Sequence, residues 1–299
     1  APGLEKAILR RLAQPMYIDG AAVRQFEEDF ATYCGTTPAL DLAYGPAALH
    51  LALLALDIGK GDEVIVPAHT FIATAAAVAM AGATPVFTDP DVETWRMDAG
   101  KAASLITPRT RAIIAVHLFG QPVEIDQFQA LCEANGIALI EDAAQAHGAR
   151  FCGQRVGSFG AMSCFSFYPG KNLGAYGDGG MVTTDNEGFA ARVRSISNHG
   201  RMSKYEHREV GYNFRMDEIQ GVILGLKLLY LDGWNARRHA IAGVYRKLLQ
   251  DLPIFMPVEV WNTDPVHHLF PIATPRRDEL LKFLRARGIE SGVHYPIPL

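Results

Sequence analysis

Short apolar runs alternate with helical stretches from about residue 39 of this 299-residue chain, and this alternation constrains the fold more than any other feature. Runs that are apolar throughout are typical of strands buried on both faces, as in a mainly parallel sheet with helical crossovers. The expected strands are 39–43, 63–66, 85–87, 111–116, 137–140, 163–168 and 180–184, and the expected helices are 47–56, 71–80 and 125–134. The pattern predicts an α/β fold with a mainly parallel sheet between helices.

The pattern changes in the C-terminal part of the chain. A long helical region is expected at 216–249, with a break at Trp234 and Asn235. After Pro253 only short strands and one helix, 278–287, are expected.

These elements predict two domains: a large one at 1–235 and a smaller α+β domain at 236–299. The sequence stops in an apolar run that no closing helix follows. We therefore expect the smaller domain to be truncated.

Composition excludes several classes of protein. The net charge of −4 provides no basic field, which argues against nucleic acid as a partner. No apolar run approaches the roughly 20 residues that cross a bilayer, so no membrane segment is expected. The four cysteines form no Cys-x-x-Cys pair, and the ten histidines form no His-Glu-x-x-His pattern. We expect reduced thiols, a cytoplasmic location and no metal site.

An acidic pair, Glu141 and Asp142, directly follows a predicted buried strand. This is the carboxyl edge of the sheet, where open α/β sheets bind ligands. Successive strand residues point to opposite faces, so at most one of the two carboxylates faces a pocket. The structural alternative for such a pair is a helix start or a salt-bridge partner.

A glycine-rich loop at 166–180 holds a single lysine, Lys171. Glycines allow backbone to approach a ligand closely, whereas a lone lysine in such a loop is otherwise solvated. The P-loop pattern fails because Phe165 and Asn172 occupy its glycine and Ser/Thr positions. The Rossmann pattern fails because no third glycine follows Gly177-Asp178-Gly179 at the required spacing.

Together the two segments fit pyridoxal-5′-phosphate (PLP). Its chemistry needs a lysine amine for covalent attachment and proton transfer, and a carboxylate on the pyridine nitrogen. It also needs a flat side chain against the ring and hydrogen-bond donors around the phosphate. The residues that fill these roles, in that order, are Lys171, Asp142, Phe71 and Ser166.

The sequence resembles the sugar aminotransferases of the fold type I PLP-dependent enzymes, known as the DegT/StrS family. Four segments carry the resemblance in the family's order and spacing: 66–74, 141–148, 166–180 and 211–218. The resemblance extends from Phe26 through Leu299.

The resemblance implies roles for matching residues. Asp142 pairs with the pyridine nitrogen, Gln145 lies near the ring hydroxyl, Phe71 stacks on the ring and Ser166 contacts the phosphate. Asn213 matches a residue that reaches the phosphate of a neighbouring subunit, which implies a homodimer with shared sites. The residues that match sugar-nucleotide contacts are Arg215, His294 and Tyr295, whereas His147, His199 and His207 are expected to be structural or outside direct contact.

One position departs from the family pattern in the phosphate region. Relatives have Ser-Gly-Thr before the helix at 47–56, where this chain has Tyr44-Gly45-Pro46. Gly45 and Ala47 at the helix start are expected as backbone contacts to the phosphate. Pro46 supplies neither a hydroxyl nor an N–H, so the phosphate is expected to lose contacts here.

The resemblance implies transfer of an amino group from L-glutamate, through pyridoxamine phosphate, to a nucleotide-linked keto sugar. Gln145, Asp178 and the stretch Lys204-Tyr205-x-His207 resemble the branch that aminates 3-keto-6-deoxyhexoses. The alternatives are a 4-keto sugar aminotransferase and a non-catalytic or regulatory relative of the same fold. Related dehydrases carry histidine in place of the lysine, and Lys171 argues against that activity.

Overall fold

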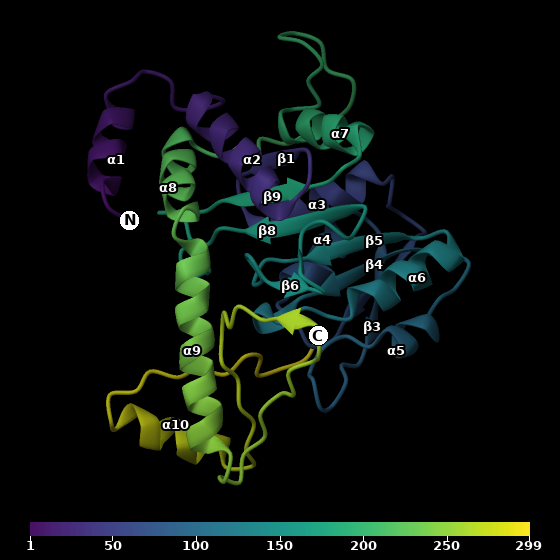
Figure 1. Ribbon diagram of the computed structural model, residues 1–299. Coiled ribbons are helices and arrows are strands. Elements are labelled where there is room, and N and C mark those ends of the chain that lie inside the picture. Colours follow the sequence, from purple (N-terminus) through teal and green to yellow (C-terminus); the bar gives the residue numbers. More distant parts are fainter.

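The computed structural model describes residues 1–299 and has a seven-stranded sheet between two layers of helices (Figure 1). The sheet order is β1-β9-β8-β5-β4-β2-β3. Its strands are β1 (Ala39–Leu42), β2 (Glu63–Pro67), β3 (Thr84–Thr88), β4 (Thr110–Val116), β5 (Ala138–Asp142), β8 (Met162–Ser166) and β9 (Gly180–Thr183). Because β9 alone pairs antiparallel with both neighbours and the other pairs are parallel, six strands run in one direction.

The helices are α1 (Leu4–Leu12), α2 (Ala21–Cys34), α3 (Gly45–Ala55), α4 (Ala73–Met80), α5 (Ala99–Ala103), α6 (Ile125–Asn135), α7 (Glu187–Ser197), α8 (Glu218–Leu228), α9 (Leu231–Leu249) and α10 (Arg277–Arg285). A short 3₁₀ turn, η1, covers Leu118–Gly120. No helix is both long enough and apolar enough to span a lipid bilayer.

Side chains of successive strand residues pack into different cores, as the period of a strand requires. On β4, Ile114 contributes to the core under α3, α4 and α7, whereas Ile113 contributes to the core under α5 and α6. On β8, Cys164 belongs to the first of these cores and Phe165 to a third one, under α2 and α8. Apart from the edge strand β3, the strands are buried on both faces, which explains why their sequences are largely apolar.

Aromatic rings fill the core under α2. Phe30 is fully buried, and its ring lies edge-on to Phe165 and Phe167, with centroids 4.9 and 5.3 Å away. Phe26 packs edge-on to Phe167 at 5.2 Å. This cluster fixes β8, and hence the loop that follows it, against α2.

The seven expected strands and the helices at α3, α4, α6 and α10 are present within a few residues of their expected bounds. The expected break at Trp234 and Asn235 is wrong: both lie inside α9, and the chain bends at Leu229 and Tyr230 instead. Neither residue interrupts the helix: the ring of Trp234 stacks on that of Tyr230, and the amide of Asn235 is hydrogen-bonded to Asn172 and to the carbonyl of His147.

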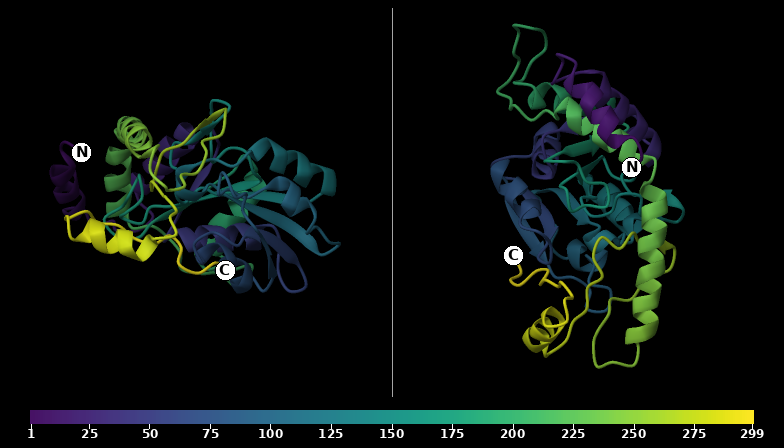
Figure 2. Two further views of the ribbon diagram at one scale, coloured as in Figure 1. Left: turned by 90° about the horizontal axis from the view of Figure 1, so that it is seen from below. Right: turned by 90° about the vertical axis from the view of Figure 1, so that its left-hand side faces the viewer.

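The C-terminal part is joined to the large body at several points. Helix α9 runs continuously through residue 235, and β10 (Thr263–Asp264) pairs with β6 (Arg150–Phe151), which pairs with β7 (Gln154–Arg155). In contrast, α10 buries no residue, and Figures 1 and 2 show α9 and α10 extending beyond one end of the body. The division into domains at 235/236 remains a prediction.

Candidate active site

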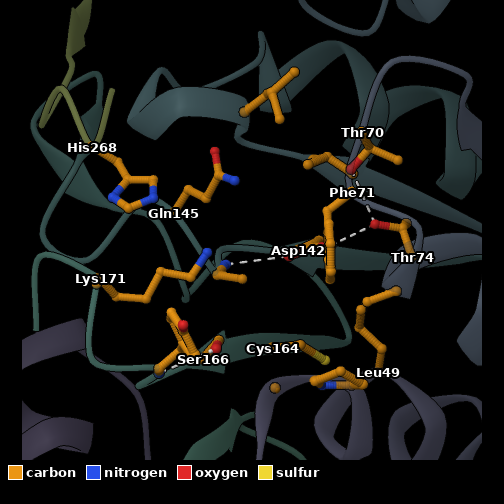
Figure 3. A pocket seen from close by; sticks show the side chains of 18 of the residues that line it. Leu49, Thr70, Phe71, Thr74, Asp142, Gln145, Cys164, Ser166, Lys171 and His268 are labelled. Atoms are coloured by element: carbon orange, nitrogen blue, oxygen red, sulfur yellow. Dashed lines mark hydrogen bonds between the residues drawn. The ribbon is translucent and has the colours of Figure 1, made fainter. Parts of the chain in front are cut away.

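A cavity of about 720 Å³ opens at the carboxyl ends of the parallel strands. Its walls come from the segments that follow β1, β2, β4, β5 and β8, as expected for a ligand site of an open α/β sheet. Figure 3 shows the side chains that converge there. Eight of the residues predicted from sequence line it: Gly45, Phe71, Asp142, Gln145, Ser166, Lys171, His294 and Tyr295.

Asp142 is the last residue of β5 and is buried at the cavity wall. Its Oδ2 accepts a hydrogen bond from Thr74 Oγ1 at 2.9 Å, and its Oδ1 accepts one from the Ala144 N–H at 3.2 Å. Burial raises the pKa of Asp142 above its ordinary value, although these hydrogen bonds and the charge of Lys171 oppose the rise. A carboxylate held this way favours a cationic partner in the cavity.

Glu141 points to the opposite side of β5, as the alternation of a strand requires. Its carboxylate accepts hydrogen bonds from the side chains of His117 and Ser163 and from three backbone N–H groups, those of Gly157, Phe159 and Gly160. Burial alone would raise its pKa, but these hydrogen bonds hold the pKa below its ordinary value. Glu141 therefore holds the loop at 157–160 to β5 and does not face the cavity.

Lys171 extends into the cavity from the loop after β8 (Figure 3). Burial lowers the pKa of its amine, and the carboxylate of Asp142 opposes this effect. A lowered pKa increases the fraction of the unprotonated amine, which is the nucleophilic form. The Gly-rich loop thus places its lysine in the cavity instead of in solvent.

Gln145 connects two walls of the cavity. Its Oε1 accepts the N–H of Phe119 at 2.7 Å, and its Nε2 donates to the hydroxyl of Tyr295 at 3.0 Å. The ring of Tyr295 in turn lies 6.0 Å from that of Phe71, which is half exposed at the cavity rim. Phe71 therefore is not a core residue.

Gly45 and Ser166 form a narrow recess at the N-terminus of α3. A Cβ at Gly45 would lie 2.5 Å from Ser166 Cβ and 2.9 Å from its Oγ, so no other residue fits there. The N–H of Ala47 donates to the carbonyl of Tyr44 at 3.1 Å, and Ala47 does not line the cavity. Pro46 lines the cavity and has no N–H to offer.

Two residues predicted for the site lie away from it. Asn213 is exposed, and its Oδ1 accepts two hydrogen bonds from the guanidinium of Arg215, at 2.7 and 3.1 Å. Arg215 also forms an ion pair with Asp19 at 3.4 Å. Within a single chain neither residue reaches the cavity.

Sequence reasoning missed several cavity residues: Thr70, Thr74, Cys164, Tyr168 and His268. Thr70 and Thr74 are hydrogen-bonded to each other at 3.1 Å, and Thr74 supplies the hydroxyl that positions Asp142. The Thr-x-x-x-Thr spacing at a helix start was the available signal. No sequence signal pointed to His268, because it comes from a C-terminal segment distant in sequence.

The cavity fits PLP on three observations. A buried carboxylate, Asp142, faces it and lacks a cationic hydrogen-bond partner; a half-buried amine, that of Lys171, extends into it; and the missing Cβ of Gly45 lets the N-terminus of α3 lie against Ser166 in the cavity wall. These groups suit the ring nitrogen, the aldehyde and the phosphate, respectively.

Comparison with known proteins agrees with this fit. The model of the DegT/DnrJ/EryC1/StrS aminotransferase family matches residues 4–299. The dTDP-3-amino-3,4,6-trideoxy-alpha-D-glucose transaminase of Streptomyces venezuelae is 47% identical over 296 residues, which are 99% of this chain and 78% of the relative.

Two crystal structures of similar proteins hold the cofactor or a reaction intermediate. S. venezuelae DesV in complex with a ketimine intermediate has a TM-score of 0.97 and 47% identity, and the match covers 99% of this chain and 80% of DesV. NtdA from Bacillus subtilis with bound PMP has a TM-score of 0.91 and 31% identity, and the match covers 100% of this chain and 70% of NtdA. The predicted fold class, the fold type I PLP-dependent transferases, is confirmed, and the chain belongs to the DegT/DnrJ/EryC1/StrS aminotransferase family.

Proposed function

We propose that this protein is a PLP-dependent aminotransferase that moves an amino group from L-glutamate to C3 of a nucleotide-linked 3-keto-6-deoxyhexose. The family match, the transaminase of S. venezuelae and the retained Lys171 and Asp142 support an enzyme over the non-catalytic alternative. The observation that carries the proposal is that Lys171, from the loop after β8, and Asp142, at the end of β5, face the same cavity.

Lys171 is the proposed catalytic amine. When bound, PLP supplies an electron sink for the bonds at the amino-bearing carbon. The Nζ of Lys171 would hold the cofactor at rest and, once released, would move a proton between the substrate carbon and the cofactor carbon. Burial supports this role because it lowers the pKa of the amine toward neutrality.

Asp142 is the proposed partner of the cofactor's ring nitrogen. Its carboxylate holds a proton on that nitrogen, and Thr74 and the Ala144 N–H fix its orientation. Ser166 and Gly45 contribute the phosphate recess, and the N–H of Ala47 is already engaged with Tyr44. Phe71 would cover the cofactor ring from the rim of the cavity, and Gln145 would lie beside its ring hydroxyl.

The C3 position is supported by the name of the S. venezuelae relative, a 3-amino sugar transaminase, and by Gln145 and Asp178 in this chain. Asp178 lines the cavity near Tyr44, whose pKa is raised by burial and then by the Asp178 charge. Amination at C4 is the alternative. L-glutamate as donor rests on the family resemblance, and the cytoplasmic location rests on the spacing of the four cysteines.

The site is proposed to be shared between two copies. No arginine lines the cavity of one chain, although the substrates carry carboxylate and phosphate groups. The loop between α7 and α8 projects from the body (Figures 1 and 2) and exposes Met202, Tyr205 and Val210. Because Asn213 lies at the end of this loop, a second copy that covers it would receive Asn213, Arg215 or both.

Replacing Lys171 by alanine is expected to lower kcat about a thousandfold or more, because no other amine lines the cavity. The matched control is Lys247→Ala, which removes an exposed lysine from α9 and should leave the rate unchanged. The measurement is amination of a nucleotide keto sugar. Substantial turnover by Lys171→Ala would overturn the assignment of the lysine.

The neighbouring acids are expected to respond differently to loss of charge. Asp142→Asn should lower the rate of the half-reaction with glutamate about a hundredfold with little change in stability, because an amide cannot hold the ring-nitrogen proton. Glu141→Gln should instead lower the free energy of unfolding by about 3 kcal/mol, because an amide NH₂ cannot accept from the donors around it. Rapid-mixing absorbance measures the rate of the half-reaction, and urea unfolding measures the free energy of unfolding, for both variants. The reverse pattern would exchange the two assignments.

The carbon that is aminated tests the substrate class. With glutamate as donor, nucleotide-linked 3-keto hexoses should be aminated, and the corresponding 4-keto sugars should react at least about tenfold more slowly. NMR of the product identifies the new C–N bond. Amination only at C4 would place the protein in the other branch of the family.

Mixed dimers test the sharing of the site. Asn213→Ala and Lys171→Ala should each be poorly active at limiting PLP, but a mixture should recover roughly a quarter of the wild-type activity, because half the dimers contain one intact site. Light scattering should report a dimer. A monomer with full activity, or no recovery on mixing, would contradict the shared site.

A further inference from the structure

Asn172 follows Lys171 directly, but its side chain is directed into the protein behind the cavity wall. It is 6% exposed, and its Nδ2 donates to Asn235 Oδ1 on α9 and to the backbone carbonyl of Val266, both at 2.9 Å. A carbonyl oxygen can only accept, so the NH₂ group must face Val266. This fixes the orientation of the amide and directs its Oδ1 to the third partner, His268.

The second amide of this network agrees with that orientation. Asn235 is also buried, and its Nδ2 donates to the carbonyl of His147 at 2.8 Å. Its Oδ1 is therefore left to accept from Asn172. In the contacts that join His147, Asn235, Asn172 and Val266, each polar atom can therefore be assigned as either a donor or an acceptor.

The orientation of Asn172 fixes the tautomer of His268. The Nδ1 of His268 lies 3.3 Å from Asn172 Oδ1, an atom that can only accept, so Nδ1 must carry the proton. The Nε2 of a neutral imidazole then has a free lone pair.

The surroundings of His268 keep its imidazole neutral. Burial lowers its pKa to about 3, and the neighbouring charges, those of Lys171, Arg238 and His294, act in the same direction. Arg238 comes from α9, and its guanidinium donates to the carbonyl of His268 at 3.4 Å. The groups that influence its pKa are thus all cationic or potentially cationic.

His268 lines the cavity together with Lys171 and Gln145 (Figure 3). On this wall the polar atoms of Gln145 are already engaged, by Phe119 and Tyr295. The Nε2 of His268 makes no hydrogen bond within the chain, and neither does the amine of Lys171; both residues line the cavity. An acceptor and a donor without partners therefore face one cavity.

We propose that His268 is a positioning residue for Lys171: its Nε2 is the acceptor to which the lysine ammonium turns when it leaves the cofactor, and Asn172 fixes the tautomer required. The inference rests on the proposed function for the role of Lys171. In this proposal the C-terminal segment contributes the imidazole of His268, which holds the side chain of Lys171 in the cavity after its release from the cofactor.

The first experiment observes the tautomer directly. In ¹⁵N-histidine-labelled protein without cofactor, the imidazole signals of His268 are assigned by their loss in His268→Gln. Near neutral pH we expect a neutral ring with the proton on Nδ1. A ring protonated on Nε2, or on both nitrogens, would overturn the proposal.

The second experiment compares two substitutions that separate the nitrogens of the ring. In His268→Asn the amide reaches only to the position of Nδ1, so the contact with Asn172 is kept and the acceptor in the cavity is lost. In His268→Gln the amide reaches to the position of Nε2, so an acceptor is kept and the contact with Asn172 is lost.

Acylation of Lys171 in cofactor-free protein at neutral pH, followed by peptide mass spectrometry, gives the readout, with Lys247 as the exposed reference. The asparagine variant should be acylated about tenfold faster, because its ammonium loses an acceptor and deprotonates more readily. The glutamine variant should remain near the wild-type rate. A purely structural role for His268 would give the opposite order or no difference, and either would overturn the proposal. Neither experiment uses substrate, so its outcome is independent of whether the protein aminates sugars.

Discussion

The hydrogen bonds that hold Glu141 determine how the site is built. On the face of β5 opposite to the cavity, two side chains and three backbone N–H groups donate hydrogen bonds to this carboxylate. These bonds fix the end of β5 and the loop at 157–160. Since successive strand residues point to opposite faces, fixing Glu141 directs Asp142 into the cavity. His117 takes part with a defined tautomer, because its Nδ1 accepts the N–H of Val123 and its Nε2 donates to Glu141. Asp142, which faces the cavity, is thus oriented by Glu141, which does not line it.

A similar division occurs at the lysine. Lys171 faces the cavity and Asn172 faces the protein, and the second residue joins the loop to α9 and to the C-terminal segment. In both pairs one residue is available for chemistry and its neighbour in sequence is engaged in fixed hydrogen bonds. Such an arrangement limits the conformational freedom of the reactive side chain without restricting its chemistry.

Much of the fold followed from local patterns. Strands buried on both faces produced apolar runs, and the ends of β5 and β8 carried the acid and the lysine that the sequence singled out. What could not be predicted depends on contacts between distant segments. The bend at Leu229 and Tyr230 has no proline or glycine to mark it, and His268 reaches the cavity from 97 residues beyond Lys171 (268 − 171). Asn213 and Arg215 resembled site residues by motif, but one chain does not bring them to its own cavity.

Helix α9 has a mechanical consequence for the parts of the molecule that it joins. Asn235, near its first turn, is buried and bonded to the lysine loop, whereas Leu249 lies 14 residues further on, about 21 Å along the axis. A tilt of about 10° around Asn235 would displace the far end by roughly 4 Å and leave the near end almost in place. The contacts of α9 with the lysine loop therefore lie close to its first turn, and a small change of angle there is amplified along the helix toward its far end.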